Sequence, residues 1–303
     1  MKQKVPIYMK AINVINPGSH STLKMQEVPT PEPAAGELLV KIEATALNRA
    51  DLLQRQGKYP SPEGTSNILG LEMAGIVERT GRNVERWKPG DFVFALLPGG
   101  GYAEFCTIPE QMAIPLPETL SFEEAAAIPE TFFTAYQALS WIGELKQGET
   151  VLIHAAGSGV GTSAVQLAHH LFNARIAATA GKKRKLAKAA KLGADWTYNY
   201  REVDFAEQMK QQLGENAVDL VIDVVGGPYW QQNLDLLATD GRLVLLAVLG
   251  GHKLKKASML PILTKRLSVR GSTLRSRSLD YKIRLTREFH DRCLKLFENE
   301  SLA

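Results

Sequence analysis

The segment 151–168, which reads VLIHAAGSGVGTSAVQLA, restricts the possible folds more than any other part of the chain. An apolar run ends at His154, small residues follow, and apolar residues then recur at helical spacing. This order predicts a strand, a tight turn and a helix. Small residues let the backbone approach a ligand, and the unpaired N–H groups at the start of a helix attract an anion. We expect a dinucleotide pyrophosphate at this turn, and a tight turn that binds nothing is the alternative.

The turn departs from the G-x-G-x-x-G spelling that is usual at dinucleotide sites. When the last glycine is aligned at Gly161, the first two positions hold Ala156 and Ser158. These side chains are small, so we expect the tight geometry to be retained.

Strands and helices alternate from about residue 129 onward. The expected strands cover 175–181, 196–200, 219–227, 242–251 and 267–273. The expected helices cover 182–192, 205–213, 229–237 and 279–297. Continuous apolar strands between amphipathic helices are typical of a parallel sheet with helices on both faces.

The first third of the chain has a different character. Short runs of β-forming residues at 9–15, 38–46, 75–78, 91–95 and 102–108 are separated by turn residues. They predict a barrel-like β domain. Ser121 and Glu124 then have the spacing of a capping box, which predicts a helix that is interrupted at Pro129.

Composition limits the class of protein. A chain of 303 residues with 45% hydrophobic residues is long enough for two domains, and a net charge of +4 is too mild to indicate nucleic acid. Cys106 and Cys293 are too few for a disulfide framework, which favours a reducing compartment. Neither a secretory signal nor an apolar run of about 20 residues is evident, so we expect a cytoplasmic protein that does not enter a membrane.

The end of the second expected strand indicates which nucleotide binds. An acidic residue there would accept hydrogen bonds from the ribose 2′-hydroxyl of NAD. This chain instead has Gly181 followed by four cations, Lys182 to Lys185. Cations in the first turn of a helix face the positive end of its dipole, so a bound phosphate would stabilise them. We therefore expect NADPH, with a solvated basic face as the alternative.

A β domain followed by a nucleotide domain resembles the medium-chain dehydrogenase/reductase superfamily. The motifs ALNRADLLQRQGKYP, NILGLEMAGIVE, GDFVFALLPGGGYAEF, IPETFFTAYQAL, HAAGSGVGTSAVQLA and DVVGGPYW resemble its zinc-free quinone oxidoreductase branch. The resemblance implies an α/β protein with a GroES-like β-barrel catalytic domain, 1–128, to which 279–303 returns as a shortened C-terminal part. It also implies a Rossmann domain with a doubly wound parallel sheet, 129–278, that binds NADPH. It also implies a homodimer, with the cofactor in the cleft between the domains.

The resemblance bears on zinc as well. Where zinc alcohol dehydrogenases have a cysteine and a histidine ligand, this chain has Asn48 and Leu71. We therefore expect no metal site. Without a Lewis acid, an acceptor that is already electrophilic is favoured over an alcohol. The expected reaction is NADPH-dependent reduction of a quinone, in particular an ortho-quinone.

The resemblance also implies roles for individual residues. It places Asn48 and Tyr59 as catalytic residues beside the nicotinamide and the quinone. The implied cofactor contacts are Ser158, Gly159, Val160 and Gly161 at the pyrophosphate; Gly181, Lys182, Lys185 and Tyr200 at the 2′-phosphate; and Val248, Leu249, Gly250, Ser272, Thr273 and Leu274 at the nicotinamide.

Three alternatives remain open at this point. The same fold and cofactor would serve a 2-alkenal or enone reductase. A phosphate-binding cleft would also serve a non-enzymatic NADPH- or RNA-binding protein. Relatives return to the β domain through a longer C-terminal segment than 279–303, so a shortened and inactive variant is the third alternative.

Overall fold

The computed structural model describes residues 5–254 and 257–303. The chain forms two compact units. Unit 1 contains the residues up to Phe133 together with Leu274–Ala303, and unit 2 contains Thr134–Thr273.

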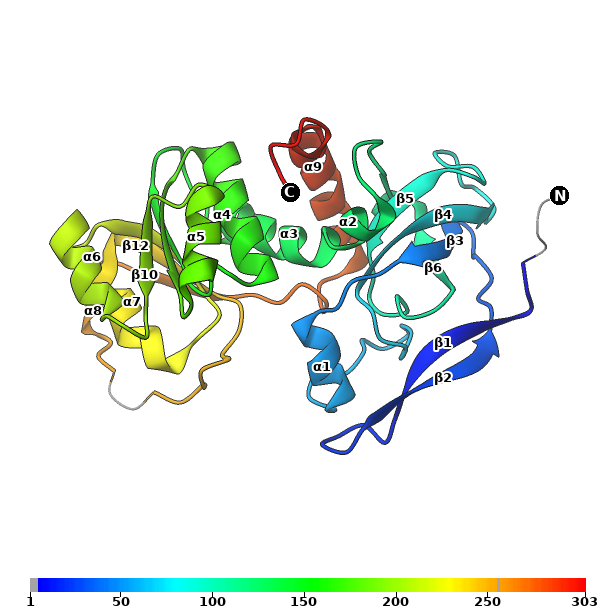
Figure 1. Ribbon diagram of the computed structural model, residues 1–303, viewed down its shortest axis with the longest axis horizontal. Helices are drawn as coiled ribbons and strands as arrows, with labels where there is room; N and C mark the ends of the chain where they lie inside the picture. Colours follow the sequence, from blue (N-terminus) through cyan, green and yellow to red (C-terminus); the bar gives the residue numbers. More distant parts are fainter. Residues whose placement is uncertain (1–4, 255–256) are drawn as a thin grey trace. The chain divides into compact units, whose positions relative to one another are not determined.

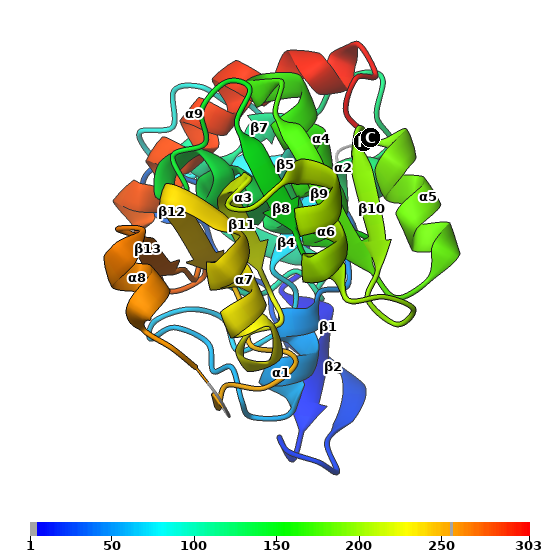
Figure 2. The same ribbon diagram turned by 90° about the vertical axis from the view of Figure 1, so that its left-hand side faces the viewer.

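Unit 2 is built on a six-stranded parallel sheet with the strand order β10-β9-β8-β11-β12-β13 (Figure 2). The strands are β8 (Thr150–Ile153), β9 (Arg175–Ala180), β10 (Trp196–Asn199), β11 (Val218–Asp223), β12 (Leu237–Leu245) and β13 (Ser268–Gly271). This is the strand order of the Rossmann fold, in which the order reverses beside the first strand. The expected doubly wound parallel sheet is confirmed.

Helices cover both faces of this sheet (Figures 1 and 2). Right-handed crossovers place α4 (Gly159–Phe172) and α5 (Lys183–Lys191) on one face. The same rule places α6 (Phe205–Leu213) and α7 (Trp230–Leu236) on the other face, where Phe205 and Leu234 belong to the buried core. A 3₁₀ turn (Gly227–Tyr229) precedes α7, and the short α8 (Leu260–Thr264) precedes β13.

The expected strand 242–251 is wrong in its second half. β12 ends at Leu245, and the chain beyond it is a loop. The N–H groups of Leu249 and Gly250 bond to the carbonyls of Val224 and Val225, which lie in the loop after β11. These residues pair with a neighbouring loop, so their apolar character reflects loop packing and not a longer strand.

Unit 1 is a five-stranded antiparallel sheet with the order β6-β3-β4-β5-β7, next to a two-stranded ribbon β1-β2 (Figure 1). The strands are β1 (Tyr8–Ile15), β2 (Thr22–Pro29), β3 (Glu37–Ala44), β4 (Glu72–Thr80), β5 (Phe92–Leu96), β6 (Phe105–Pro109) and β7 (Ile114–Pro115). An isolated bridge joins Ala11 of the ribbon to Ala103. Leu38, Met73 and Val93 lie in the buried core of the sheet.

Two elements of unit 1 carry no sequence signal that we recognised. Strand β2 has exposed side chains at almost every position, so no buried and exposed residues alternate along it. Helix α1 (Arg49–Arg55) has only seven residues, and a capping box between Asn48 and Asp51 starts it. Both elements depend on pairing or capping contacts rather than on hydrophobic periodicity.

The expected interruption at Pro129 is confirmed. Helix α2 (Phe122–Ala126) starts at the capping box of Ser121 and Glu124, and Pro129 is the first residue of α3 (Pro129–Tyr136), which continues into a π-helical turn (Gln137–Ile142). A 3₁₀ turn (Glu110–Met112) lies between β6 and β7.

Helix α9 (Leu279–Glu298) confirms the helix expected at 279–297. It packs in unit 1, where the rings of Phe289 and Phe297 lie 6.4 and 5.0 Å from that of Phe132. This contact anchors the start of α3.

Candidate active site

The glycine-rich turn of unit 2 presents free N–H groups. Ser158 caps α4, and its hydroxyl accepts the N–H of Gly161 at 3.1 Å. A Cβ at Gly161 would lie 2.4 Å from the carbonyl oxygen of Ala155, so only glycine fits there. In the described structure the N–H groups of Gly159 and Val160 have no acceptor, as at any helix N-terminus. This geometry suits a phosphate.

A corner for a second phosphate lies beyond β9. A Cβ at Gly181 would be 2.6 Å from the hydroxyl of Tyr200 and 2.9 Å from Nε of Arg201. The side chain of Lys185 lies over Gly157 in the glycine-rich turn, 2.6 Å from where a Cβ would be. The structure therefore brings Gly181, Lys185 and Tyr200 to the same edge of the sheet as the turn. We call this group, together with Arg201, the anion corner.

Arg201 was missed in the sequence analysis. It directly follows Tyr200 at the end of β10 and is exposed. The sequence does carry a signal for Arg201, because this cation stands next to Tyr200, which is expected at the 2′-phosphate. Lys182 is also exposed and is the N-cap of α5, and it makes no side-chain capping bond.

The remaining sequence-predicted cofactor residues follow β12 and β13. Val248, Leu249 and Gly250 lie in the loop after β12, where Val248 and Leu249 are 42% and 55% exposed. Ser272 follows β13, and its hydroxyl is one of five buried side-chain polar atoms without a partner among the described residues. Thr273 ends unit 2, whereas Leu274 is buried in unit 1.

The loops after β11 and β12 are held by a buried network. Asp223 accepts the N–H groups of Val225 and Gly226, and Asn233 donates to it at 3.1 Å. His154 bonds to Asn233 and Thr179, and burial lowers the pKa of its imidazole. This network fixes the edge of the sheet at which all these loops meet, so His154 and Asp223 are structural.

Asn48 belongs to a polar cluster in unit 1. Its side-chain amide donates to Oε1 of Glu72 at 2.6 Å, and its backbone N–H donates to Asp51 at 2.8 Å. Asp51 also accepts the N–H of Gly70 and the hydroxyl of Tyr102, at 3.1 Å each. The amide of Asn48 is therefore held in one orientation.

Tyr59 is paired with Arg275. The guanidinium lies 5.3 Å from the centre of the tyrosine ring, and it donates to the carbonyl of Pro98 and the hydroxyl of Ser61. Arg275 is only 5% exposed. The contact fixes the ring of Tyr59 in unit 1 from a residue more than 200 positions away in the sequence.

Two glutamates in this cluster have unusual pKa values. Burial raises the pKa of Glu72 to about 7, although the Glu130 N–H and the Asn48 amide oppose this shift. Burial, and then the charges of Glu72 and Asp51, raise the pKa of Glu130 to about 8. Neither glutamate was among the residues predicted from the sequence. We call Asp51, Glu72 and Glu130 the carboxyl cluster.

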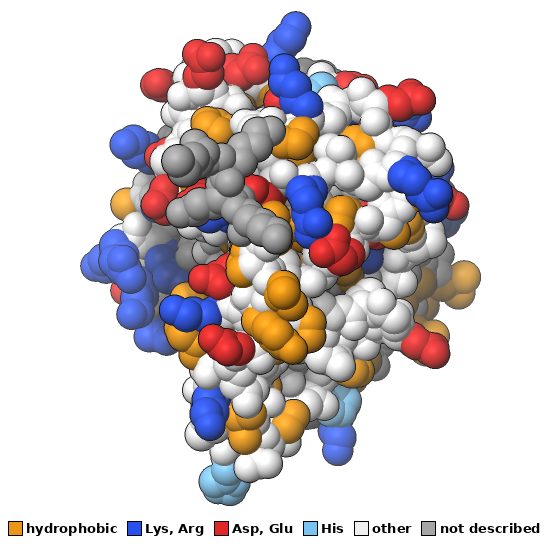
Figure 3. Space-filling view, turned by 90° about the vertical axis from the view of Figure 1, so that its right-hand side faces the viewer, with side chains coloured by type: hydrophobic (Ala, Val, Ile, Leu, Met, Phe, Trp, Pro, Cys, Tyr) orange, Lys and Arg blue, Asp and Glu red, His pale blue; other side chains and the backbone are white. Residues whose placement is uncertain are grey.

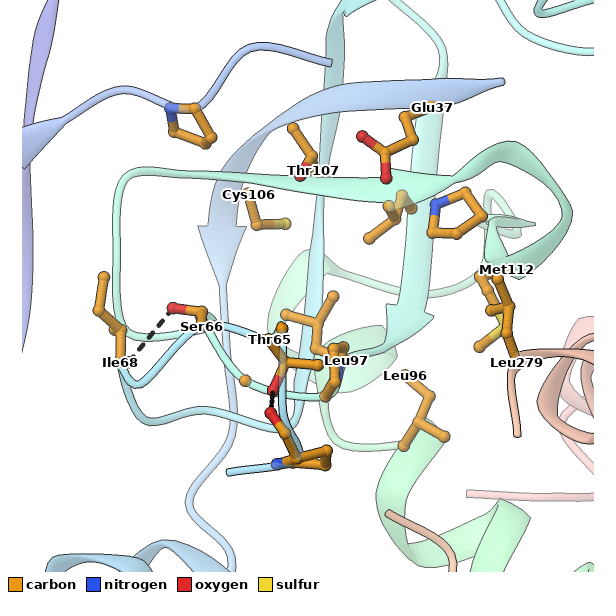
Figure 4. A pocket seen from close by; sticks show the side chains of 18 of the residues that line it. Glu37, Thr65, Ser66, Ile68, Leu96, Leu97, Cys106, Thr107, Met112 and Leu279 are labelled. Carbon is orange, nitrogen blue, oxygen red and sulfur yellow. Dashed lines mark hydrogen bonds between the residues drawn. The ribbon is translucent and has the colours of Figure 1, made fainter. Parts of the chain in front are cut away.

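A cavity of about 660 Å³ lies elsewhere in unit 1. Figure 4 shows mainly apolar side chains in its wall, among them Ile68, Leu96 and Leu97. Arg275 and Lys282 line it as well, whereas Asn48 and Tyr59 do not. The volume is within the range of small-molecule pockets, and the wall is continuous with the loop that follows Tyr59.

The face of the molecule drawn in Figure 3 carries acidic and basic side chains together, with hydrophobic ones between them. Among the described residues, no three His, Cys, Asp or Glu side chains are placed to hold a metal ion. In the same part of the chain, no helix has the length and apolar character needed to span a bilayer.

Two family models match the chain. Residues 34–118 match the alcohol dehydrogenase GroES-like domain, and residues 159–290 match the zinc-binding dehydrogenase model. With the Rossmann sheet and its glycine-rich turn, they define the class of the protein as a medium-chain dehydrogenase/reductase, an oxidoreductase that uses a nicotinamide cofactor.

Individual relatives narrow the class. The chain is 33% identical over 270 residues to the quinone oxidoreductase of Sus scrofa, covering 88% of this chain and 81% of the relative. The quinone oxidoreductase of Escherichia coli, solved in complex with NADPH, has a TM-score of 0.82 and 30% identity over 97% of this chain and 89% of its own. The CurK enoyl reductase has a TM-score of 0.83 and 30% identity over 97% of this chain and 89% of its own. The chain belongs to the quinone oxidoreductase family of the medium-chain dehydrogenases/reductases.

Proposed function

We propose that the protein reduces quinones, in particular ortho-quinones, with NADPH and without zinc. The observation that carries the cofactor assignment is the anion corner. It combines a half-buried lysine over the glycine-rich turn with Tyr200 and Arg201 over Gly181, and no acidic residue follows β9 directly. Such a corner favours a 2′-phosphate over the 2′-hydroxyl of NADH. The nicotinamide, when bound, supplies the hydride.

The donor set of unit 1 does not fit zinc. Leu71 has no ligand atom, and the amide of Asn48 is already bonded to Glu72. Zinc in proteins prefers thiolate and imidazole ligands, and neither occurs at these two positions. In the proposed site Asn48 and Tyr59 orient the acceptor. We further propose that the residues named above as cofactor contacts, from Ser158 to Leu274, bind the pyrophosphate, the 2′-phosphate and the nicotinamide as the resemblance implies.

Lys185→Ala tests the cofactor assignment. A charge-assisted hydrogen bond contributes about 1.5–3 kcal/mol, so the variant should bind NADPH about tenfold to a hundredfold more weakly. NADH affinity should hardly change, because NADH has no 2′-phosphate. Isothermal titration with both cofactors measures the effect, and Lys188→Ala, on the same helix, is the matched control. Equal losses for NADPH and NADH would contradict the assignment.

An enone or 2-alkenal reductase is the second candidate function. The similarity to an enoyl reductase structure favours it, because reduction of a conjugated double bond also takes a hydride and a proton. NADPH oxidation with an ortho-quinone and with a 2-alkenal separates the two. We expect faster turnover of the quinone, and turnover of the alkenal alone would replace the proposal.

We also propose that the protein is a cytoplasmic homodimer. Strand β13 is at the edge of its sheet, and nearby Met259, Leu260 and Leu263 are 79%, 62% and 77% exposed. An open edge next to exposed apolar side chains is a favourable surface for self-association. Cys106 and Cys293 are both buried thiols, which is typical of a reducing compartment. Light scattering during gel filtration tests the dimer, and a monomer would contradict it.

A further inference from the structure

Reduction of a quinone consumes one proton in addition to the hydride. The hydroxyl of Tyr59 and solvent are two candidate sources of this proton. We propose that Glu130 holds this proton as a neutral carboxylic acid and donates it to the reduced acceptor. This inference rests on the quinone reductase function proposed above.

The hydrogen bonds of Glu72 favour ionisation of this glutamate over ionisation of Glu130. Its Oε1 accepts the amide of Asn48 at 2.6 Å, and its Oε2 accepts the backbone N–H of Glu130 at 2.8 Å. Hydrogen bonds to both oxygens stabilise a carboxylate. Glu72 is also only 1% exposed, so its geometry is fixed.

The carboxyl of Glu130 has the opposite surroundings. Among the described residues, no donor is bonded to either of its side-chain oxygens, although its backbone N–H is bonded to Glu72. Its side chain therefore lies near an anion without any hydrogen bond to compensate. The residue is partly exposed, so its proton can be exchanged. Of the two glutamates, Glu130 therefore holds a proton more strongly, because its carboxylate form lacks donors.

The charges that face Glu130 come from several elements of unit 1. They are Asp51 on α1, Glu72 on β4, Arg275 in the segment before α9, and Lys282 on α9. Asp51 and Glu72 are stabilised as anions by hydrogen bonds, and the two cations balance them. A neutral Glu130 leaves the group uncharged overall, whereas an ionised Glu130 would add an uncompensated charge in a poorly solvated site.

Glu130 also lies near the proposed acceptor position, because the carboxylate of Glu72 accepts hydrogen bonds both from the side-chain amide of Asn48 and from the backbone N–H of Glu130. Burial raises the pKa of Tyr59, and the charge of Glu130 adds to this shift while Arg275 opposes it. The pKa of Glu130 itself, about 8, agrees with a proton held at neutral pH. An acid with a pKa near the working pH is suited to general acid catalysis.

The step balances as follows. The acceptor takes up a hydride, with its two electrons, from the cofactor and becomes a hydroquinone monoanion. The O–H bond of Glu130 breaks, and an O–H bond forms on the anionic oxygen. The Glu130 carboxylate that remains is not balanced by a cation of its own, so it takes a proton back from water. No further oxidant or reductant is needed.

Infrared spectroscopy of the protein without cofactor tests where the proton is. The wild-type protein should show the C=O band of a protonated carboxylic acid at pH 7, and this band should disappear as the pH rises through about 8. Glu130→Gln should lose the part of the band that disappears near pH 8, whereas Glu123→Gln, an exposed glutamate on α2, should retain it. Absence of this part of the band in wild type, or its survival in Glu130→Gln, would overturn the proposal.

Steady-state kinetics tests the transfer. Glu130→Gln should lower kcat for the quinone about a hundredfold, with KM within about twofold of wild type, because a general acid acts on the transition state. The fall of kcat in wild type above pH 8 should be absent in the variant. Glu130→Asp, which keeps the acid, should recover part of the rate. Unchanged kcat in Glu130→Gln would refute the donor role.

The two proposals fail in different ways. A wild-type protein that shows the band but reduces no quinone would contradict the proposed function. A protein that reduces quinones but shows no protonated carboxyl would contradict only the role of Glu130.

Discussion

The anion corner of unit 2 and the carboxyl cluster of unit 1 differ in how their residues are brought together. In the corner, Gly181, Lys185 and Tyr200 each lie in or near a turn that follows β9 or β10, and Lys185 contacts the glycine-rich turn that follows the adjacent parallel strand β8. In the cluster, Glu72 and Glu130 come from segments that are distant in the sequence. Arg275, whose charge acts on Glu130, lies near the C-terminal end of the chain.

The difference also concerns charge. The corner collects cations and free N–H groups, so an incoming phosphate stabilises it. The cluster collects carboxyls that water cannot fully solvate, so a proton stabilises it. One site is prepared to bind an anion, and the other is prepared to hold and release a proton.

The largest effect is expected at the glycine-rich turn. Gly161→Ala would bring a Cβ to 2.4 Å from the carbonyl oxygen of Ala155, so the turn must shift. We expect both NADPH and NADH to bind at least about a hundredfold more weakly, which corresponds to about 2.7 kcal/mol. Calorimetric titration measures this, and Gly271→Ala, where nothing lies within 4 Å, is the control. Normal affinity in Gly161→Ala would show that the glycine-rich turn does not bind the cofactor.

A smaller effect is expected at Arg201. Its guanidinium is exposed, so its contribution to phosphate binding is partly screened by solvent. Arg201→Ala should weaken NADPH about threefold to tenfold and leave NADH unchanged. Salt should reduce the difference between the variant and wild type, because the contact is electrostatic. A salt-independent loss would mean that Arg201 acts through packing against Gly181 instead.

The carboxyl cluster predicts a pH dependence of stability. The folded-state pKa of Glu130, about 8, exceeds the ordinary value of 4.5, so the folded protein binds the proton more strongly than the unfolded chain. This contribution to stability is complete below pH 4.5 and is lost as the pH rises through about 8. Glu130→Gln should therefore lose less stability than wild type between pH 6 and pH 9 in urea unfolding.

Glu124 supplies a control of opposite sign. Hydrogen bonds from Ser121 lower the pKa of its carboxyl, so its contribution is present above the ordinary pKa and is lost as the pH falls. Glu124→Gln should leave the slope between pH 6 and pH 9 unchanged. An altered slope there, or an unaltered one in Glu130→Gln, would show that the cluster does not hold the proton.

The smallest effect is expected at Tyr59. Tyr59→Phe keeps the ring that lies beside Arg275 and removes only the hydroxyl. If Glu130 supplies the proton, kcat for the quinone should stay within about twofold of wild type, a change below about 0.5 kcal/mol. A large drop in kcat with unchanged KM would transfer the donor role to the tyrosine.

Much of the fold could be predicted because local sequence patterns specify it. The apolar strands and amphipathic helices of unit 2 predicted the parallel sheet, and the capping box at Ser121 predicted the start of α2. The exposed strand β2 could not be found, because pairing with β1 holds it and burial does not. The loop after β12 was misread as strand because its apolar residues pack on the neighbouring loop.

The sequence by itself determined the Rossmann sheet, the glycine-rich turn, the cations after β9 and the absence of zinc-ligand types at Asn48 and Leu71. These features depend on residues that are close in the chain or on residue identity alone. Only the tertiary structure decided that Asn48 is tied to Glu72, that Arg275 lies beside Tyr59, and that Glu130 lies among charges without a donor. The physical reason is that burial and the placement of charges from distant segments set the protonation of a carboxyl, and no local pattern records them.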